Sequence, residues 1–146
     1  MTSIREAVLE DIKDIQIIRN AVKENTLSDP ALISDEDVLK FMTIRGKGWV
    51  GIKDEQITGF AIVDLTNNNI WALFVHPNEE SKGAGKQLHK KMLDWYFSKT
   101  NDDCWLSTTP GTRAEKFYEM QGWIRDGLYG KDEIKFIMTR SVWNNN

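Results

Sequence analysis

Cysteine and proline are scarce in this sequence: of 146 residues, one is cysteine and three are proline. The lone Cys104 excludes a disulfide framework within the chain. The longest apolar run, residues 70–75, is far shorter than the ~20 residues that a membrane-spanning helix needs. Residues 1–11 are rich in charge and lack the apolar stretch of a signal peptide. We therefore expect a cytoplasmic protein with a reduced thiol and no membrane partner.

An excess of basic residues is also missing, since 19 Lys and Arg stand against 22 Asp and Glu, for a formal net charge of −3. Clamping a nucleic-acid backbone requires a basic face, so we expect no nucleic-acid partner. The 40% of hydrophobic and 28% of charged residues are typical of a globular chain. We expect a single domain over residues 1–146, whose core needs no structural metal. No metal site is expected.

Hydrophobic periodicity and turn residues predict elements in the order β-α-α-β-β-β-α-β-α-β-β. This order indicates the α+β class, with a mixed α/β sheet of six to seven strands flanked by about four helices. The C-terminal residues 143–146 are expected to be unstructured. The expected strands are residues 3–7, 49–53, 57–64, 70–75, 104–108, 123–129 and 134–139, and the expected helices are residues 9–22, 34–42, 85–98 and 112–121.

Residues 70–75, the helix from Gly85 and residues 104–108 form a β-α-β crossover, which places its two strands parallel. Ligands of open α/β sheets bind beyond the carboxyl ends of such strands. The crossover therefore indicates a ligand site between Val75 and Gly85.

Positive charge is concentrated in that region, because residues 81–91 contain four lysines and a histidine but no acid. Gly83 and Gly85 precede the helix, where backbone N–H groups and the helix dipole attract anions. The pattern favours an anion site over the alternative, a solvated lysine face with an ordinary glycine turn.

The two common nucleotide motifs do not fit this segment. Glu80 stands where a P-loop needs its first glycine, and Gln87 follows Lys86 where Ser or Thr is required. The dinucleotide fingerprint fails because Leu88 occupies the place of its last glycine.

Two longer stretches resemble the GNAT superfamily of N-acetyltransferases. Residues 73–77, Leu-Phe-Val-His-Pro, and residues 80–85, Glu-Ser-Lys-Gly-Ala-Gly, are similar to its Val-x-Pro strand end followed by [QR]-x-x-G-x-[GA]. Residues 113–123 are similar to its A-x-x-F-Y-x-x-x-G-[FW] segment. Residues 5–11 and 57–60 also match its first and third strands, so the resemblance covers nearly the whole chain.

The sequence departs from the family pattern at two positions. Glu80 replaces the usual Gln or Arg, so a side-chain contact to the pyrophosphate is lost or inverted. Backbone amides carry most of the phosphate binding, so this change should weaken it rather than abolish it. Gly111 replaces an Asn that many members place near the pantetheine arm.

The resemblance implies a GNAT-like acyl-CoA N-acyltransferase fold and transfer of an acetyl group from acetyl-CoA to a primary amine of a small molecule or protein. The resemblance also implies that the amine attacks the thioester directly. A homodimer that forms through the closing hairpin is common in such folds. The residues implied in cofactor binding are Leu73, Phe74, Val75, Ser81, Lys82, Gly83, Ala84, Gly85, Lys86, Lys116, Phe117 and Tyr118.

By the same resemblance, the backbone N–H of Val75 polarises the thioester carbonyl, and Tyr118 is the general acid for the leaving thiolate. No carboxylate lies on the strand at residues 70–75, so the general base stays open. His76 is a weak candidate, with Asp64 and Asp126 as alternatives. Cys104 is expected to be a small buried hydrophobe, because direct transfer needs no acyl-enzyme.

Two other functions remain open at this point. The missing carboxylate allows an acyl-CoA-binding domain without turnover, and the glycine- and lysine-rich loop allows an unrelated nucleotide-binding domain. The acceptor is expected to bind between the first two helices, their loop at residues 25–33 and the Gly130 hairpin. Carboxylates in those segments mildly suggest a cationic amine: Glu24, Asp29, Asp132 and Glu133.

Overall fold

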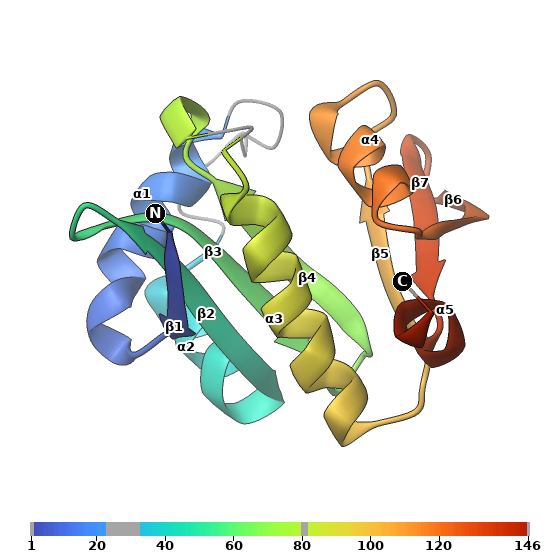
Figure 1. Ribbon diagram of the computed structural model, residues 1–146, viewed down its shortest axis with the longest axis horizontal. Coiled ribbons are helices and arrows are strands. Elements are labelled where there is room, and N and C mark those ends of the chain that lie inside the picture. The colour runs from blue at the N-terminus through green and yellow to red at the C-terminus, as the bar shows by residue number, and fades with distance from the viewer. Residues whose placement is uncertain (1, 23–32, 80–81, 146) are drawn as a thin grey trace.

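The computed structural model describes residues 2–22, 33–79 and 82–145, so predictions for Glu24, Asp29, Glu80 and Ser81 lie outside the described residues. Seven strands form one mixed sheet, as predicted, and their order in the sheet is β1-β2-β3-β4-β5-β7-β6 (Figure 1). All neighbouring strands are antiparallel except β4 and β5, which are parallel. The strands are β1 Ser3–Glu6, β2 Gly46–Lys53, β3 Gln56–Asp64, β4 Asn69–Val75, β5 Cys104–Thr108, β6 Ile124–Tyr129 and β7 Glu133–Met138.

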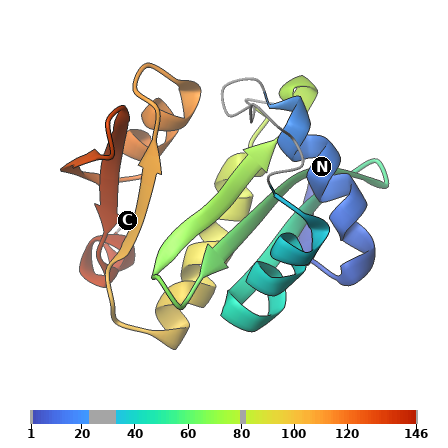
Figure 2. The same cartoon turned by 180° about the vertical axis from the view of Figure 1, so that it is seen from behind.

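The helices cover both faces of the sheet. The long α3 crosses one face in Figure 1, whereas α1 and α2 lie on the opposite face, best seen in Figure 2. Each face has its own apolar cluster: Leu88, Met92 and Tyr96 of α3 belong to the first, and Ile15 and Ile18 of α1 to the second. The helices are α1 Ile12–Ala21, α2 Asp35–Lys40, α3 Ala84–Lys99, α4 Arg113–Met120 and α5 Arg140–Asn144. Within the described ranges, no helix is both long and apolar enough to cross a bilayer.

Strand β2 begins three residues before the predicted start at Trp49. Glycine has low strand propensity, so Gly46 and Gly48 hid this extension. A Cβ at Gly46 would lie 1.8 Å from the carbonyl oxygen of Val63. Only glycine allows the two strands to approach this closely, so here the residue marks a strand rather than a loop.

Helix α2 continues into a π-helical turn, Phe41–Arg45. Tertiary contacts hold this turn, because Phe41 stacks on Trp71 at 4.1 Å between ring centroids. Arg45 pairs with buried Asp64 at 2.8 Å.

The prediction of an unstructured C-terminus is wrong for residues 143 and 144, which belong to α5. The hydroxyl of Thr139 accepts a hydrogen bond from the N–H of Val142 and so caps the helix. Trp143 packs its ring 5.3 Å from that of His89 and donates its indole N–H to Asp94 at 2.9 Å. The helix therefore depends on contacts with α3, which a five-residue pattern does not reveal.

Candidate active site

Strands β4 and β5 diverge almost as soon as they meet. They share one residue pair, Asn69 with Trp105, at the start of both strands. The N–H of His76 donates to Thr58 on β3 at 2.7 Å. Backbone direction alternates along a strand, so the N–H groups of Val75 and Leu73 point away from β3, into the gap. The gap is thus lined by main-chain groups of β4 that β5 does not pair.

The N-terminus of α3 opens beside this gap. Gly83 has φ of 89° and precedes the helix in the left-handed region, which glycine adopts without strain. The N–H of Gln87 makes the first intrahelical bond, to Gly83, at 3.1 Å. The preceding amides of Ala84, Gly85 and Lys86 therefore have no intrahelical acceptor. No acidic residue lies in the first turn, so the positive end of the helix dipole is uncompensated.

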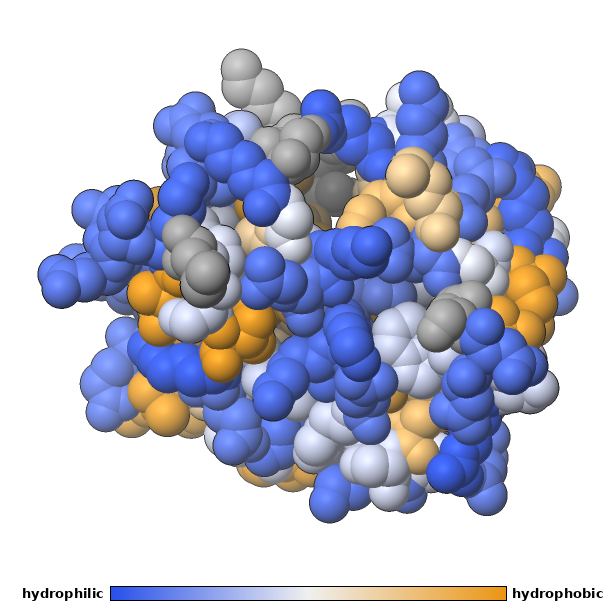
Figure 3. Space-filling view, viewed as in Figure 1, coloured by the Kyte–Doolittle hydropathy of each residue, from blue (hydrophilic) through white to orange (hydrophobic). Residues whose placement is uncertain are grey.

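Three of the predicted regions meet at Gly85. A Cβ on this residue would lie 3.6 Å from Val75 Cγ2 and 3.8 Å from Phe117 Cε1. The helix start, the carboxyl end of β4 and α4 thus converge, and Figure 3 shows the surface hollowed between α3 and α4. The arrangement places free amides next to the gap, as a site for an anion attached to an extended chain requires.

The lysines of residues 82–91 are only partly available to an anion. Lys82 lies 3.7 Å from Glu79, which also pairs with Lys53 at 3.2 Å. Lys90 pairs with Asp94 at 2.7 Å. Lys86 is exposed in the first turn of α3 and has no carboxylate partner among the described residues. Lys86 and the amides of the first turn therefore remain available to an anion.

His89 does not contribute to that positive charge, because its side chain is fully buried. Its Nε2 accepts a hydrogen bond from the indole N–H of Trp123 at 2.9 Å. Burial lowers its pKa from 6.5 to about 4, so the ring is neutral at pH 7. This structural link between α3 and the start of β6 was not evident from the sequence, where His89 looks like one of the exposed cations.

The three predicted residues of α4 differ in environment. Lys116 is exposed, Phe117 is half-buried and Tyr118 is buried at 7% exposure. The ring of Tyr118 packs against those of Phe117 and Trp123. Burial raises the pKa of its hydroxyl, which forms no hydrogen bond within the described part of the chain. The group stays protonated at physiological pH and is available as a donor.

The base candidates lie in different places. His76 follows β4 directly, and its Nδ1 accepts the N–H of Asn78 at 3.1 Å, so that Nε2 has no hydrogen bond to any residue that the structure describes. Asp64 lies opposite Asn69, at the far end of β4 from Val75, and is held by Arg45. Asp126 is exposed on the edge strand β6, 3.9 Å from Lys135. Of the three, His76 lies nearest to the gap along the chain.

Gly111 stands where the family pattern has an asparagine. Gly111 has φ of 80°, a left-handed conformation that glycine and asparagine adopt most readily, which explains their exchange here. Its N–H donates to Glu115 at 2.7 Å.

Cys104 is fully buried in the cluster beneath α3, and burial raises the pKa of its thiol. The cysteine is therefore a packing residue, as expected.

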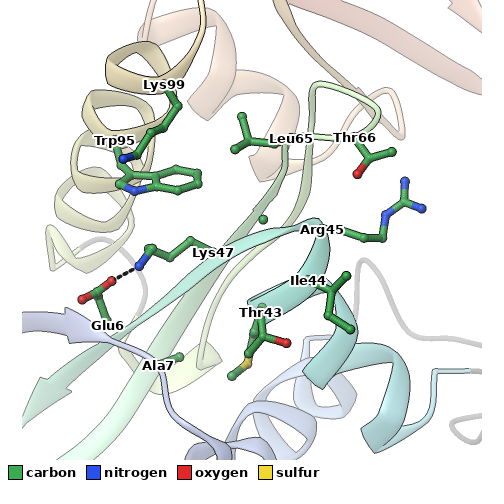
Figure 4. A pocket seen from close by; sticks show the side chains of 12 residues that line it. Glu6, Ala7, Thr43, Ile44, Arg45, Lys47, Leu65, Thr66, Trp95 and Lys99 are labelled. Carbon is green, nitrogen blue, oxygen red and sulfur yellow. Dashed lines mark hydrogen bonds and ion pairs between the residues drawn. The ribbon is translucent and has the colours of Figure 1, made fainter.

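A separate cavity of about 720 Å³ lies at the other end of the sheet (Figure 4). It is bordered by Arg45, Lys47, Trp95 and Lys99. Lys47 pairs with Glu6 and Arg45 with Asp64, so two of its three cations are already neutralised. This cavity is distinct from the gap between β4 and β5.

The comparison with solved structures supports the fold. The PaiA N-acetyltransferase from Thermoplasma acidophilum, solved in complex with coenzyme A, superposes with a TM-score of 0.81 at 15% identity, covering 95% of this chain and 99% of that one. The ribosomal-protein-S18-alanine N-acetyltransferase from Escherichia coli gives 0.74 at 17%, covering 94% and 92%. A GNAT-family acetyltransferase from Bacillus cereus gives 0.73 at 20%, covering 95% and 97%.

No curated protein matches the sequence. A sequence model of the acetyltransferase (GNAT) family matches residues 11–123, which is most of the chain. That stretch contains the gap-lining strand β4, the glycine-rich start of α3 and the aromatic pair of α4. The chain therefore belongs to the acetyltransferase (GNAT) family and is an acyltransferase that takes its acetyl group from acetyl-CoA.

Proposed function

We propose that the protein acetylates a primary amine that enters the gap between β4 and β5. The observation that carries the proposal is the single residue pair between these strands, beside an uncompensated helix N-terminus. The unpaired N–H and C=O groups of Leu73 and Val75 are suited to hydrogen-bond an extended pantetheine arm as a further strand would. This site would hold the donor with its thioester near Val75.

The pyrophosphate would bind at the start of α3. The amides of Ala84, Gly85 and Lys86 supply hydrogen-bond donors, and Lys86 supplies a charge. Lys82 lies beside this site but shares its charge with Glu79. Ser81, Leu73, Phe74, Lys116 and Phe117 stay predicted contacts of the cofactor.

In the transfer itself, the amine nitrogen forms a bond to the thioester carbon and the carbon–sulfur bond breaks. The N–H of Val75 donates to the carbonyl oxygen as negative charge develops there. The leaving thiolate takes a proton from Tyr118, and the amine loses one to solvent or to His76. Tyr118 recovers its proton from solvent after the products leave.

The anion site can be tested by Gly85→Asp. A side chain fits here, because a Cβ meets its neighbours only at ordinary contact distances. A carboxylate in the first turn stabilises the free helix but repels a pyrophosphate. We expect an unchanged or higher Tm and a loss of acetyl-CoA affinity of at least about 10-fold, measured by calorimetry.

Gly85→Ala is the matched control, since it adds the Cβ without the charge and should bind acetyl-CoA almost normally. Equal affinity in the folded Gly85→Asp protein would refute the assignment of this helix start to the pyrophosphate. A thiol-release assay with a panel of amines then tests turnover, and release above the rate of hydrolysis is expected.

The predicted homodimer has one supporting feature. The edge strand β6 exposes large apolar side chains, with Ile124 at 44%, Leu128 at 74% and Tyr129 at 48% exposure. An exposed apolar edge strand favours pairing with another strand. Sedimentation equilibrium would give the mass of the dimer if this edge is its interface and of the monomer if it is not.

A further inference from the structure

Arg19, in the last turn of α1, is a buried cation that has no anionic partner among residues 2–22, 33–79 and 82–145. The residue is 7% exposed, and its Nε and Nη2 atoms are buried with no hydrogen-bond partner. No carboxylate pairs with it in the described ranges. A buried charge is costly unless it is paired, so an arginine kept in this state requires an anionic partner that the described residues do not supply.

Aromatic rings surround the guanidinium of Arg19. Its Cζ lies 4.8 Å from the centroid of the Trp71 ring, 5.4 Å from that of Phe74 and 5.8 Å from that of Phe60. These cation–π contacts offset part of the cost of burial, but ring faces accept none of the N–H donors in the plane of the group. The rings therefore hold the guanidinium in place and leave its N–H donors without a partner in the described part of the chain.

A β-bulge brings two of these rings together. Residues three apart on a regular strand face opposite sides, yet Trp71 and Phe74 both pack against the cluster under α1. The register shifts between Ile62 and Val63, which leaves Trp71 as the extra residue of β4. Trp71 and Phe74 are only half-buried, so Arg19 lies close beneath the surface.

The aromatic cage of Arg19, formed by the rings of Phe60, Trp71 and Phe74, adjoins the proposed reaction site. Phe74, whose ring lies beneath the guanidinium, directly precedes Val75, whose N–H points into the gap. From these positions we infer that Arg19 binds a carboxylate of the acceptor, which is thus a small molecule carrying both a primary amine and a carboxylate. The inference rests on the proposed function. It adds a carboxylate to the cationic amine that the sequence mildly suggested, because a guanidinium binds a carboxylate through two parallel hydrogen bonds.

The test compares amino acids with their carboxamides as acceptors in the wild type and in Arg19→Met. The two acceptors differ in the basicity of their amines, so the informative number is the change in their kcat/KM ratio between the proteins. We expect Arg19→Met to lower kcat/KM about 10- to 100-fold for the free acid and less than about twofold for the carboxamide. Arg19→Lys keeps the charge but loses the planar guanidinium with its paired N–H donors. Its kcat/KM for the free acid should therefore lie between those of the wild type and Arg19→Met.

Arg140→Met is the matched control, since Arg140 is exposed on α5 and its loss removes one positive charge elsewhere. This variant should leave the ratio unchanged. Equal loss for acid and carboxamide in Arg19→Met, or no loss in either, would overturn the inference while leaving acetyl transfer intact.

A second measurement does not depend on turnover or on a variant that folds. The side-chain Nε–Hε signal of Arg19 in the wild type is followed by NMR during titration with N-acetyl amino acids and with their carboxamides. A saturable shift with the acids alone supports the inference, and the absence of such a shift overturns it. Failure of every amine to release thiol would contradict the proposed function separately, because the titration still reports on Arg19.

Discussion

The pair of His89 and Trp123 shows how a single residue can couple stability to pH. The buried imidazole accepts one hydrogen bond through Nε2, and its Nδ1 has no partner within the described part of the chain. Protonation would place a cation among the rings of Phe117, Tyr118 and Trp143 and break the bond from Trp123. The fold therefore stabilises the neutral form.

We expect the free energy of unfolding to fall by about 2 kcal/mol between pH 7 and pH 5. The pKa of His89 is about 4 in the folded protein and 6.5 when unfolded, so the unfolded chain takes up the proton first. This contribution is complete above pH 6.5 and is lost as the pH falls toward 4. Urea unfolding at several pH values measures it.

The other histidine supplies the control. His76 lies at the end of β4, and His76→Gln should keep the same pH profile as the wild type. His89→Gln should flatten it. A wild-type stability that is equal at pH 5 and pH 7 would contradict the assigned role of His89.

Tyr118 is the second residue whose role can be separated from packing. Tyr118→Phe keeps the ring and removes a hydroxyl that makes no hydrogen bond among the described residues. We expect kcat to fall about 10²-fold, because proton transfer to the thiolate is lost, and Tm to change by less than about 2 °C, because little packing is lost. An unchanged kcat would exclude Tyr118 as the proton donor.

The residues that the sequence predicted are those that follow a short local pattern. Gly83 and Gly85 stand at a helix start, and Val75 ends a strand, so their positions can be predicted from neighbouring residues. Arg19 cannot be recognised in this way. It follows Ile18 in an ordinary amphipathic helix, and its cage is formed by rings from β3 and β4 that only the tertiary structure brings together.

At the scale of elements, β4 is a strand with one paired and one free edge near its end. The backbone N–H groups of Phe74 and His76 point toward β3, whereas those of Leu73 and Val75 point into the gap. In the free protein we expect slow hydrogen exchange at the amides of Phe74 and His76 and fast exchange at those of Leu73 and Val75. Native-state exchange followed by NMR resolves this alternation.

Acetyl-CoA should slow exchange at Leu73 and Val75 specifically, because both amides would then donate to the cofactor. Coenzyme A lacking the acetyl group tests the two positions separately, since Val75 is the one assigned to the carbonyl oxygen. Equal protection of all four amides in the free protein would rule out an open edge on β4.

The elements themselves were predictable to the extent that their patterns are local. The bounds of β5 agree with the prediction, because its alternating burial is visible in the sequence. The start of β2 was missed, since the close approach at Gly46 depends on a partner strand. Helix α5 was missed because its stability comes from Trp143 packing on α3 rather than from its own periodicity.

On the scale of the whole molecule, α3 joins two parts of the sheet that scarcely touch through their backbones. Its side chains Leu88, Met92 and Tyr96 share one apolar cluster with Leu106 and Phe136 of β5 and β7. Besides the pair with Asn69, Trp105 donates to the turn before β4, to Asn67 and Asn68. Most of the cohesion between the two parts is therefore side-chain packing.

A ligand that binds both parts should stabilise the fold strongly. With acetyl-CoA at 100 times its Kd we expect about 2.7 kcal/mol of added stability and a rise in Tm of several degrees. Thermal unfolding measures the rise, and Gly85→Asp, with an affinity at least about 10-fold lower, should leave about 1.4 kcal/mol or less at the same acetyl-CoA concentration. A rise of the same size in Gly85→Asp would mean that the ligand acts elsewhere.

The narrow junction between β4 and β5 also determines where the chain can be divided. Residues 101–103 are exposed and connect α3 to β5. A break there separates β1–β4 and α1–α3 from β5–β7, α4 and α5, two fragments whose contact surface includes the proposed cofactor site. Packing of α3 on β5 and β7 would drive reassembly of the separately expressed fragments, and acetyl-CoA bound at the proposed site would strengthen it, which makes this fold a natural template for a split reporter of acetyl-CoA concentration.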